Sequence, residues 1–91
     1  MHLSEEQIKQ IEEMAYRLMS PELIAINIEV DEDDFTDTLT HLDSNVRKAY
    51  YKGLIRQQSD LRESIIKAAH NGSNPAQEQL LKMMNKIIST I

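Results

Sequence analysis

Four basic side chains fall within a short stretch near the middle of the chain, with two tyrosines between them. They are Arg47, Lys48, Lys52 and Arg56, and the tyrosines are Tyr50 and Tyr51. Arginine and lysine at such a site bind phosphate groups and fix the register of a protein on nucleic acid without reading its bases. The cluster therefore predicts phosphate contacts. The simpler alternative is a solvated helix face, with Tyr50 in the core instead of stacked on a base.

Polar side chains suited to contacts with base edges come just before this cluster. They are Thr36, Thr38, Thr40 and His41. In a helix-turn-helix, exposed residues of the second helix lie in the major groove and contact the bases there. The same segment is rich in carboxylates, and each carboxylate about 8 Å from a phosphate costs about 0.5 kcal/mol in water before screening. Tight DNA binding is therefore expected only if other subunits supply basic surface.

The acidic run that begins at Asp31 has the composition of a calcium loop but not its spacing. With Asp31 as the first ligand, Thr36 stands where the sharp turn needs glycine and Leu42 where the loop needs its closing glutamate. These carboxylates instead suit the first turn of a helix, where they meet the positive end of its dipole. No calcium site is expected.

Nothing else in the sequence suits metal binding or catalysis. His2, His41 and His70 are scattered along the chain, and none has a second histidine or cysteine three or four residues away, as a zinc site on a helix would favour. Serine and threonine are frequent, but no nucleophile motif and no glycine-rich phosphate loop is present. We expect a protein without metal, cofactor or catalytic activity.

The elements that must position these residues are all expected to be helices. Glycine and proline number two each, and no segment longer than six residues alternates β-branched and polar residues as a strand does. Helix start signals at Ser4, Ser20 and Asp31 predict a first helix that ends near Met19, a second over 21–28 and a third over 32–42. Residues 1–43 therefore form a three-helix unit of the helix-turn-helix type, with Phe35, Leu39 and Leu42 facing inward and Leu23 on the apolar face of the second helix.

Residues 44–91 are predicted to form a long helix and a last helix in an antiparallel hairpin. The long helix runs from Asn45 to about Asn71, with Gly72 as its left-handed terminus, and the last helix starts at Asn74. Gly53 predicts a close neighbouring helix or a bend. The last helix carries more leucine, isoleucine and methionine than its partner can cover, which favours self-association through the hairpin. The alternative is a monomer whose hairpin folds back on the first three helices.

Charge and composition limit the class of protein. Residues 1–45 carry a net charge of −10 and residues 46–91 carry +5, within a total of −5. Such asymmetry favours contacts between oppositely charged ends of neighbouring chains, or one face toward an anion. The chain lacks cysteine, which suits a reducing cytoplasm, and shows neither a signal peptide nor a membrane span. We expect a cytoplasmic protein with no membrane partner.

Two segments resemble a known family. They read MSPELIAINIEVDEDDFTDTLTH and VRKAYYKGLIRQQSDLRESIIKAAHNGSNPAQEQLLKMM. Both are similar to the homeodomain-like helix-turn-helix and following hairpin of small terminase subunits and related phage or prophage DNA-packaging proteins, over about residues 8–86. The second segment keeps the family's order of Ala49, Tyr50 and Gly53, then Ala68, Ala69 and Gly72, then Ala76, Leu80 and Leu81. The chain departs from the pattern at Glu29, where glycine is common, and in its acidic recognition helix.

The resemblance implies a non-catalytic protein that oligomerises through its hairpin, binds double-stranded DNA near a packaging start site and hands it to a larger packaging subunit. Ala49, Tyr50 and Gly53 would then be structural. The acidic charge of the first three helices indicates an alternative function. The chain would then be an acidic helical module that binds a basic protein and does not contact DNA directly.

Overall fold

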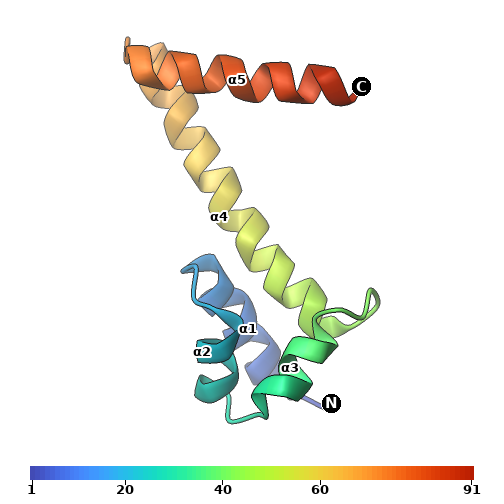
Figure 1. Cartoon of the computed structure of the whole chain (residues 1–91). Coiled ribbons are helices and arrows are strands. Elements are labelled where there is room, and N and C mark those ends of the chain that lie inside the picture. Colours follow the sequence, from blue (N-terminus) through green and yellow to red (C-terminus); the bar gives the residue numbers. More distant parts are fainter. The chain divides into compact units, whose positions relative to one another are not determined.

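The computed structural model describes residues 1–91, and every regular element in it is a helix. The helices are α1 (Glu5–Tyr16), α2 (Pro21–Asn27), α3 (Glu32–Thr38), α4 (Asn45–His70) and α5 (Asn74–Thr90). Figure 1 shows their order along the chain. The all-α prediction is confirmed. No helix combines the length and the apolar character that crossing a bilayer requires.

Side-chain caps set where the helices begin. The Ser4 hydroxyl accepts a hydrogen bond from the backbone N–H of Gln7, and the Gln7 side chain accepts one from the Ser4 N–H. Ser20 caps α2, with proline at the first helical position, and Asp31 caps α3 through the Asp34 N–H at 3.0 Å. Ser73 caps α5. These bonds satisfy backbone donors that a helix start leaves unpaired, so the predicted starts are confirmed.

The predicted end of the third helix at residue 42 is wrong, because α3 ends at Thr38. The Thr38 hydroxyl donates to the Asp34 carbonyl at 2.7 Å, and the Thr40 hydroxyl donates to the Asp37 carbonyl at 2.6 Å. Such bonds compete with continued helix. Leu42 consequently lies outside the helix and is 76% exposed, so its predicted inward orientation is also wrong.

The chain divides into two compact units, Met1–Gln57 and Gln58–Ile91. The boundary expected after residue 43 differs from this division. The start of α4 belongs to the first unit because Val46 and Ala49 are part of its core.

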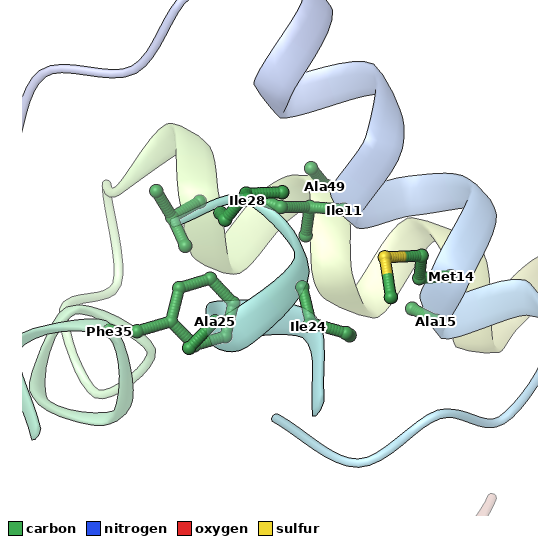
Figure 2. Packing of buried hydrophobic residues seen from close by; sticks show 9 residues of the cluster. Ile11, Met14, Ala15, Ile24, Ala25, Ile28, Phe35 and Ala49 are labelled. Atoms are coloured by element: carbon green, nitrogen blue, oxygen red, sulfur yellow. The ribbon is translucent and has the colours of Figure 1, made fainter. Parts of the chain in front are cut away.

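Apolar side chains from α1, α2, α3 and the start of α4 form the core of the first unit (Figure 2). Phe35, Ile11 and Ile24 are its largest fully buried side chains, and each contributes about 1.5–3 kcal/mol through burial. Phe35 therefore faces inward as predicted, and Leu39 packs half-buried against the same cluster. Leu23 does not join the core, because its side chain is 49% exposed on the outer side of α2.

Gly53 lies where α4 passes very close to α1. A Cβ atom added there would overlap the Glu12 carbonyl oxygen, and it would lie 2.8 Å from the Ala15 Cβ and 2.9 Å from the Tyr16 nitrogen. Only glycine fits between these atoms. Of the two explanations predicted for this glycine, the close neighbouring helix is the one observed.

In the second unit, the end of α4 and α5 form an open hairpin whose arms separate from the turn (Figure 1). Gly72 has φ of +96°, the left-handed conformation expected at the end of α4. The Gln77 side chain donates to the Ala69 carbonyl at 3.0 Å and holds the start of α5 against the turn. Ala69 is buried, but α5 has no buried residue. Most apolar side chains of α5 are therefore left in contact with solvent.

Candidate nucleic-acid interface

The α2–turn–α3 segment is held from two sides by α1. The Gln7 side chain donates to the Ile28 carbonyl at 3.1 Å, and the Asn27 amide contacts the Met14 sulfur at 3.3 Å. Glu29, in the turn, has φ of +62°, a left-handed conformation that favours glycine. Glutamate therefore occupies a backbone position that would suit glycine better. The bonds of Gln7 and Asn27 fix the end of α2, just before the turn that leads to α3.

The structure distributes the four predicted base-reading residues over two elements. Thr36 and Thr38 lie on α3, and Thr40 and His41 lie in the turn after it. Thr38 and Thr40 donate their hydroxyls to backbone carbonyls, and the His41 ring nitrogen lies 3.5 Å from an Asp37 carboxylate oxygen. Thr36 is therefore the one member with an exposed hydroxyl on the helix and no bond to its own chain.

Acidic side chains surround these residues. Glu32, Asp33, Asp34 and Asp37 are all exposed on α3. Asp31, Asp34 and Asp37 also line an open hollow of about 840 Å³, together with Thr38 and His41. No group of histidine, aspartate and glutamate in the chain is arranged to hold a metal ion. The hollow is therefore an acidic surface between α3, the start of α4 and the N-terminal segment.

Arg47 is engaged within its own unit. Its guanidinium donates to the Leu39 carbonyl at 2.8 Å, and it lies over the Tyr51 ring at 4.6 Å from the centroid. The first contact satisfies a carbonyl just beyond the end of α3, and the second is a cation–π interaction. Arg47 therefore ties α3 to α4. Tyr50, beside it, is half-buried, and its pKa is raised by burial and then by the neighbouring Tyr51.

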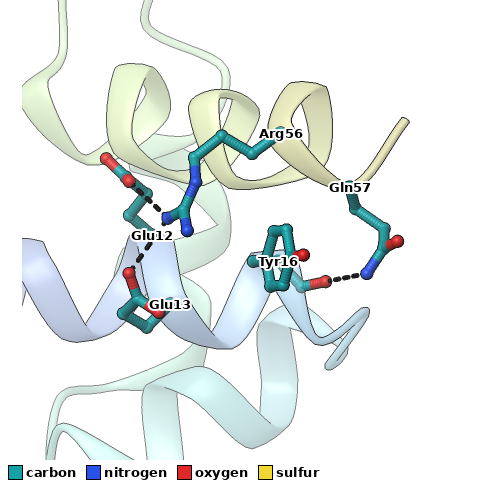
Figure 3. A network of polar contacts seen from close by, with 5 residues as sticks. All are labelled: Glu12, Glu13, Tyr16, Arg56 and Gln57. Atoms are coloured by element: carbon teal, nitrogen blue, oxygen red, sulfur yellow. Dashed lines mark hydrogen bonds and ion pairs between the residues drawn. The ribbon is translucent and has the colours of Figure 1, made fainter. Parts of the chain in front are cut away.

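Arg56 is the most strongly paired of the four bases (Figure 3). Its guanidinium donates to Glu12 at 2.7 Å and to Glu13 at 2.9 Å, and it lies over the Tyr16 ring at 4.6 Å. Hydrogen bonds to Glu13 and then Glu12 raise the pKa of Arg56. The neighbouring Gln57 donates to the Tyr16 carbonyl at 2.8 Å. This network fastens α4 to the end of α1, and it lowers the positive charge that Arg56 offers to a ligand.

Lys48 and Lys52 are the two bases of the cluster that remain exposed without an ion pair. They line a shallow hollow of about 410 Å³ whose other charged residues are Glu5 and Glu12. This hollow and the acidic one share three lining residues, namely Leu3, Ile8 and Asn45. The hollow lined by the two lysines therefore adjoins the hollow lined by Thr38 and His41. Thr36 and Thr40 line neither hollow.

The sequence pattern identified the four bases of the cluster. It did not identify the residues that engage Arg47 and Arg56 and leave Lys48 and Lys52 free. Glu12 and Arg56 are 44 positions apart, and no local spacing connects them. The signal that was available is Gly53, because a close approach of two helices at that glycine brings the end of α1 beside the next turn of α4. No family model, curated protein or solved structure matches the chain.

Proposed function

We propose that the chain is a non-catalytic helix-turn-helix protein that binds double-stranded DNA, of the small terminase type that its sequence resembles. The observation that carries this proposal is the α2–turn–α3 segment, whose α2 end is bonded to α1, with two unpaired lysines of α4 in a hollow that adjoins the one lined by Thr38 and His41. Lys48 and Lys52 would contact phosphates. Residues of α3 and of the turn after it would lie near the groove.

The charges around this surface set the expected strength of binding. Arg56 is held by two carboxylates and Arg47 by a carbonyl and a ring, so each unit offers about two free cations to phosphates. Asp31, Asp34 and Asp37 oppose the approach of DNA. One unit should therefore bind weakly. Several units joined in one assembly would bind more tightly, because the later contacts form at a high effective concentration.

A salt titration of duplex binding tests this proposal. Each phosphate contact contributes about −0.9 to the slope of log affinity against log salt, so two lysines predict a slope of about −2 for each bound unit. The double variant Lys48→Gln/Lys52→Gln should lose most of this slope and bind much more weakly.

The matched control is Lys9→Gln/Arg17→Gln, which removes the same charge from α1 and from the residue that follows its end, outside both hollows. It should leave the slope nearly unchanged. Absence of binding to any duplex at low salt, or equal losses in the two double variants, would reject a phosphate contact at Lys48 and Lys52.

A second function, an acidic module for a basic protein, is favoured by one observation. The exposed carboxylates of Glu32, Asp33 and Asp34 have no ion pair with any base of the chain. The larger packaging subunit that the resemblance implies is one such partner. A lysine- and arginine-rich peptide would then bind the wild-type chain, and Asp33→Asn/Asp34→Asn would weaken that binding. If DNA is the ligand, the same variant should instead bind duplex more tightly, because two repulsive charges are gone.

A further inference from the structure

One side of α5, continued by Ile91 just beyond the end of the helix, carries an apolar stripe that is largely exposed. Leu81, Met84, Ile88 and Ile91 are spaced by three, four and three residues, and their exposed fractions are 59%, 49%, 64% and 99%. A three–four spacing aligns side chains along one side of a helix and is the pattern by which two helices pair. This stripe is separate from Ala76, Leu80 and Met83, which are half-buried.

The charged residues of α5 lie away from this stripe. Glu78, Lys82 and Lys86 follow one another at every fourth position, which places them together on another side of the helix. The stripe itself contains no charge. A second, identical stripe can therefore approach it without like-charge repulsion, and the charged side of each helix stays in water.

The spacing of the stripe reads the same in both directions. If a second α5 runs antiparallel, Leu81 faces Ile91 of that copy and Met84 faces Ile88, and the same two pairs recur on the other side of the two-fold axis. All four positions of each stripe are then matched. Antiparallel helices also place opposite dipole ends beside each other.

We propose that α5 pairs with α5 of a second copy of this chain, in antiparallel register, through Leu81, Met84, Ile88 and Ile91. This pairing deepens the proposed function by naming the contact through which DNA-binding units are joined. A standard stable interface buries about 800 Å² on each partner, and a short two-helix seam buries less. The dimer should therefore be concentration-dependent, with dissociation in the micromolar range.

Disulfide trapping tests the register, and the chain suits it because it has no cysteine of its own. Met84→Cys and Ile88→Cys are prepared as separate full-length chains of different mass, mixed without DNA and oxidised. The mixed Met84→Cys–Ile88→Cys dimer should be the main product, since the antiparallel register places these two positions opposite each other. Pairing Met84→Cys with Ser89→Cys is the control, because residue 89 lies on the charged side of α5.

Sedimentation of the cysteine-free chain gives a second, independent measurement. Wild-type protein at about 100 µM should sediment as a dimer and Ile88→Glu as a monomer, whereas Ser89→Glu should remain dimeric. Same-residue disulfides in place of the mixed one would overturn the antiparallel register. A monomeric wild type at this concentration, or trapping no faster than in the Ser89→Cys control, would overturn the pairing itself. Because DNA is absent, either failure leaves the lysine titration to decide DNA binding separately.

Discussion

Replacing Gly53 with alanine should change the stability of the first unit through two opposing effects, namely a gain in helix propensity and a loss from overpacking. In an exposed helix, alanine is more stable than glycine by about 1 kcal/mol. At Gly53, however, the added methyl group would overlap the Glu12 carbonyl oxygen and lie 2.8 Å from the Ala15 Cβ. Neither obstacle is the mobile end of a long side chain, so α1 and α4 must move apart.

The magnitude follows from these two terms. Overpacking against fixed atoms costs about 3 kcal/mol at the upper end of its usual range, so the net loss should be about 2 kcal/mol after the gain in helix propensity. A small domain loses about 4–8 °C in Tm for each kcal/mol. The expected decrease in Tm is therefore about 8–16 °C. Separation of the helices should also break the contacts of Arg56 with Glu12 and Glu13.

Tyrosine signals allow the assay to report on the first unit alone. The chain has three tyrosines and no tryptophan, and Tyr16, Tyr50 and Tyr51 all lie within Met1–Gln57. Thermal unfolding followed by near-ultraviolet circular dichroism should show the lower Tm for Gly53→Ala. Gly72→Ala is the control, because its site is open and strained only by φ of +96°, and it lies in the second unit. That variant should leave the tyrosine transition in place. An unchanged or higher Tm for Gly53→Ala would refute the close packing of α1 on α4.

Three further outcomes follow from the first unit. Glu29→Gly should raise stability by about 1 kcal/mol in urea unfolding, because it removes a side chain from φ of +62°; a loss would contradict the strained turn. Phe35→Ala should cost about 3–5 kcal/mol, whereas Ile26→Ala, at a site 63% exposed, should change stability little; equal effects would place Phe35 outside the core. Burial raises the pKa of Tyr50 above its ordinary 10.0, so the neutral phenol favours the folded state. That contribution is complete below pH 10 and is lost as pH rises through the folded-state pKa, which absorbance at 295 nm should detect as one late-titrating tyrosine.

Local signals in the sequence predicted where the helices begin. They did not predict which residues of different helices contact each other. Ser4, Ser20 and Asp31 cap helices where the pattern placed them, because capping depends on atoms three residues away. The end of α3 was misplaced because apolar periodicity continues to Leu42, whereas the threonine hydroxyls at 38 and 40 bond backbone carbonyls and stop the helix.

The candidate site shows the same division between local and distant information. The sequence does not distinguish the four bases Arg47, Lys48, Lys52 and Arg56. Their spacing indicates that they share one helix but not which other residues pack against each of them. Arg56 meets Glu12 and Glu13 only after α1 and α4 have packed together at Gly53. The number of free cations in the cluster is therefore a tertiary property.

This loss of free cations links the proposed DNA-binding surface to the proposed pairing of α5. For Arg56 to bind a phosphate it would have to leave Glu12 and Glu13, and the phosphate would then approach two uncompensated carboxylates. The lysines are thus the main source of attraction in each unit, and the carboxylates of α3 reduce it. If both proposals hold, occupancy of DNA depends on how many units act together, because joined units add their weak contacts. The apolar stripe of α5 and the two lysines would then be parts of one binding mechanism, although they lie in different units of the chain.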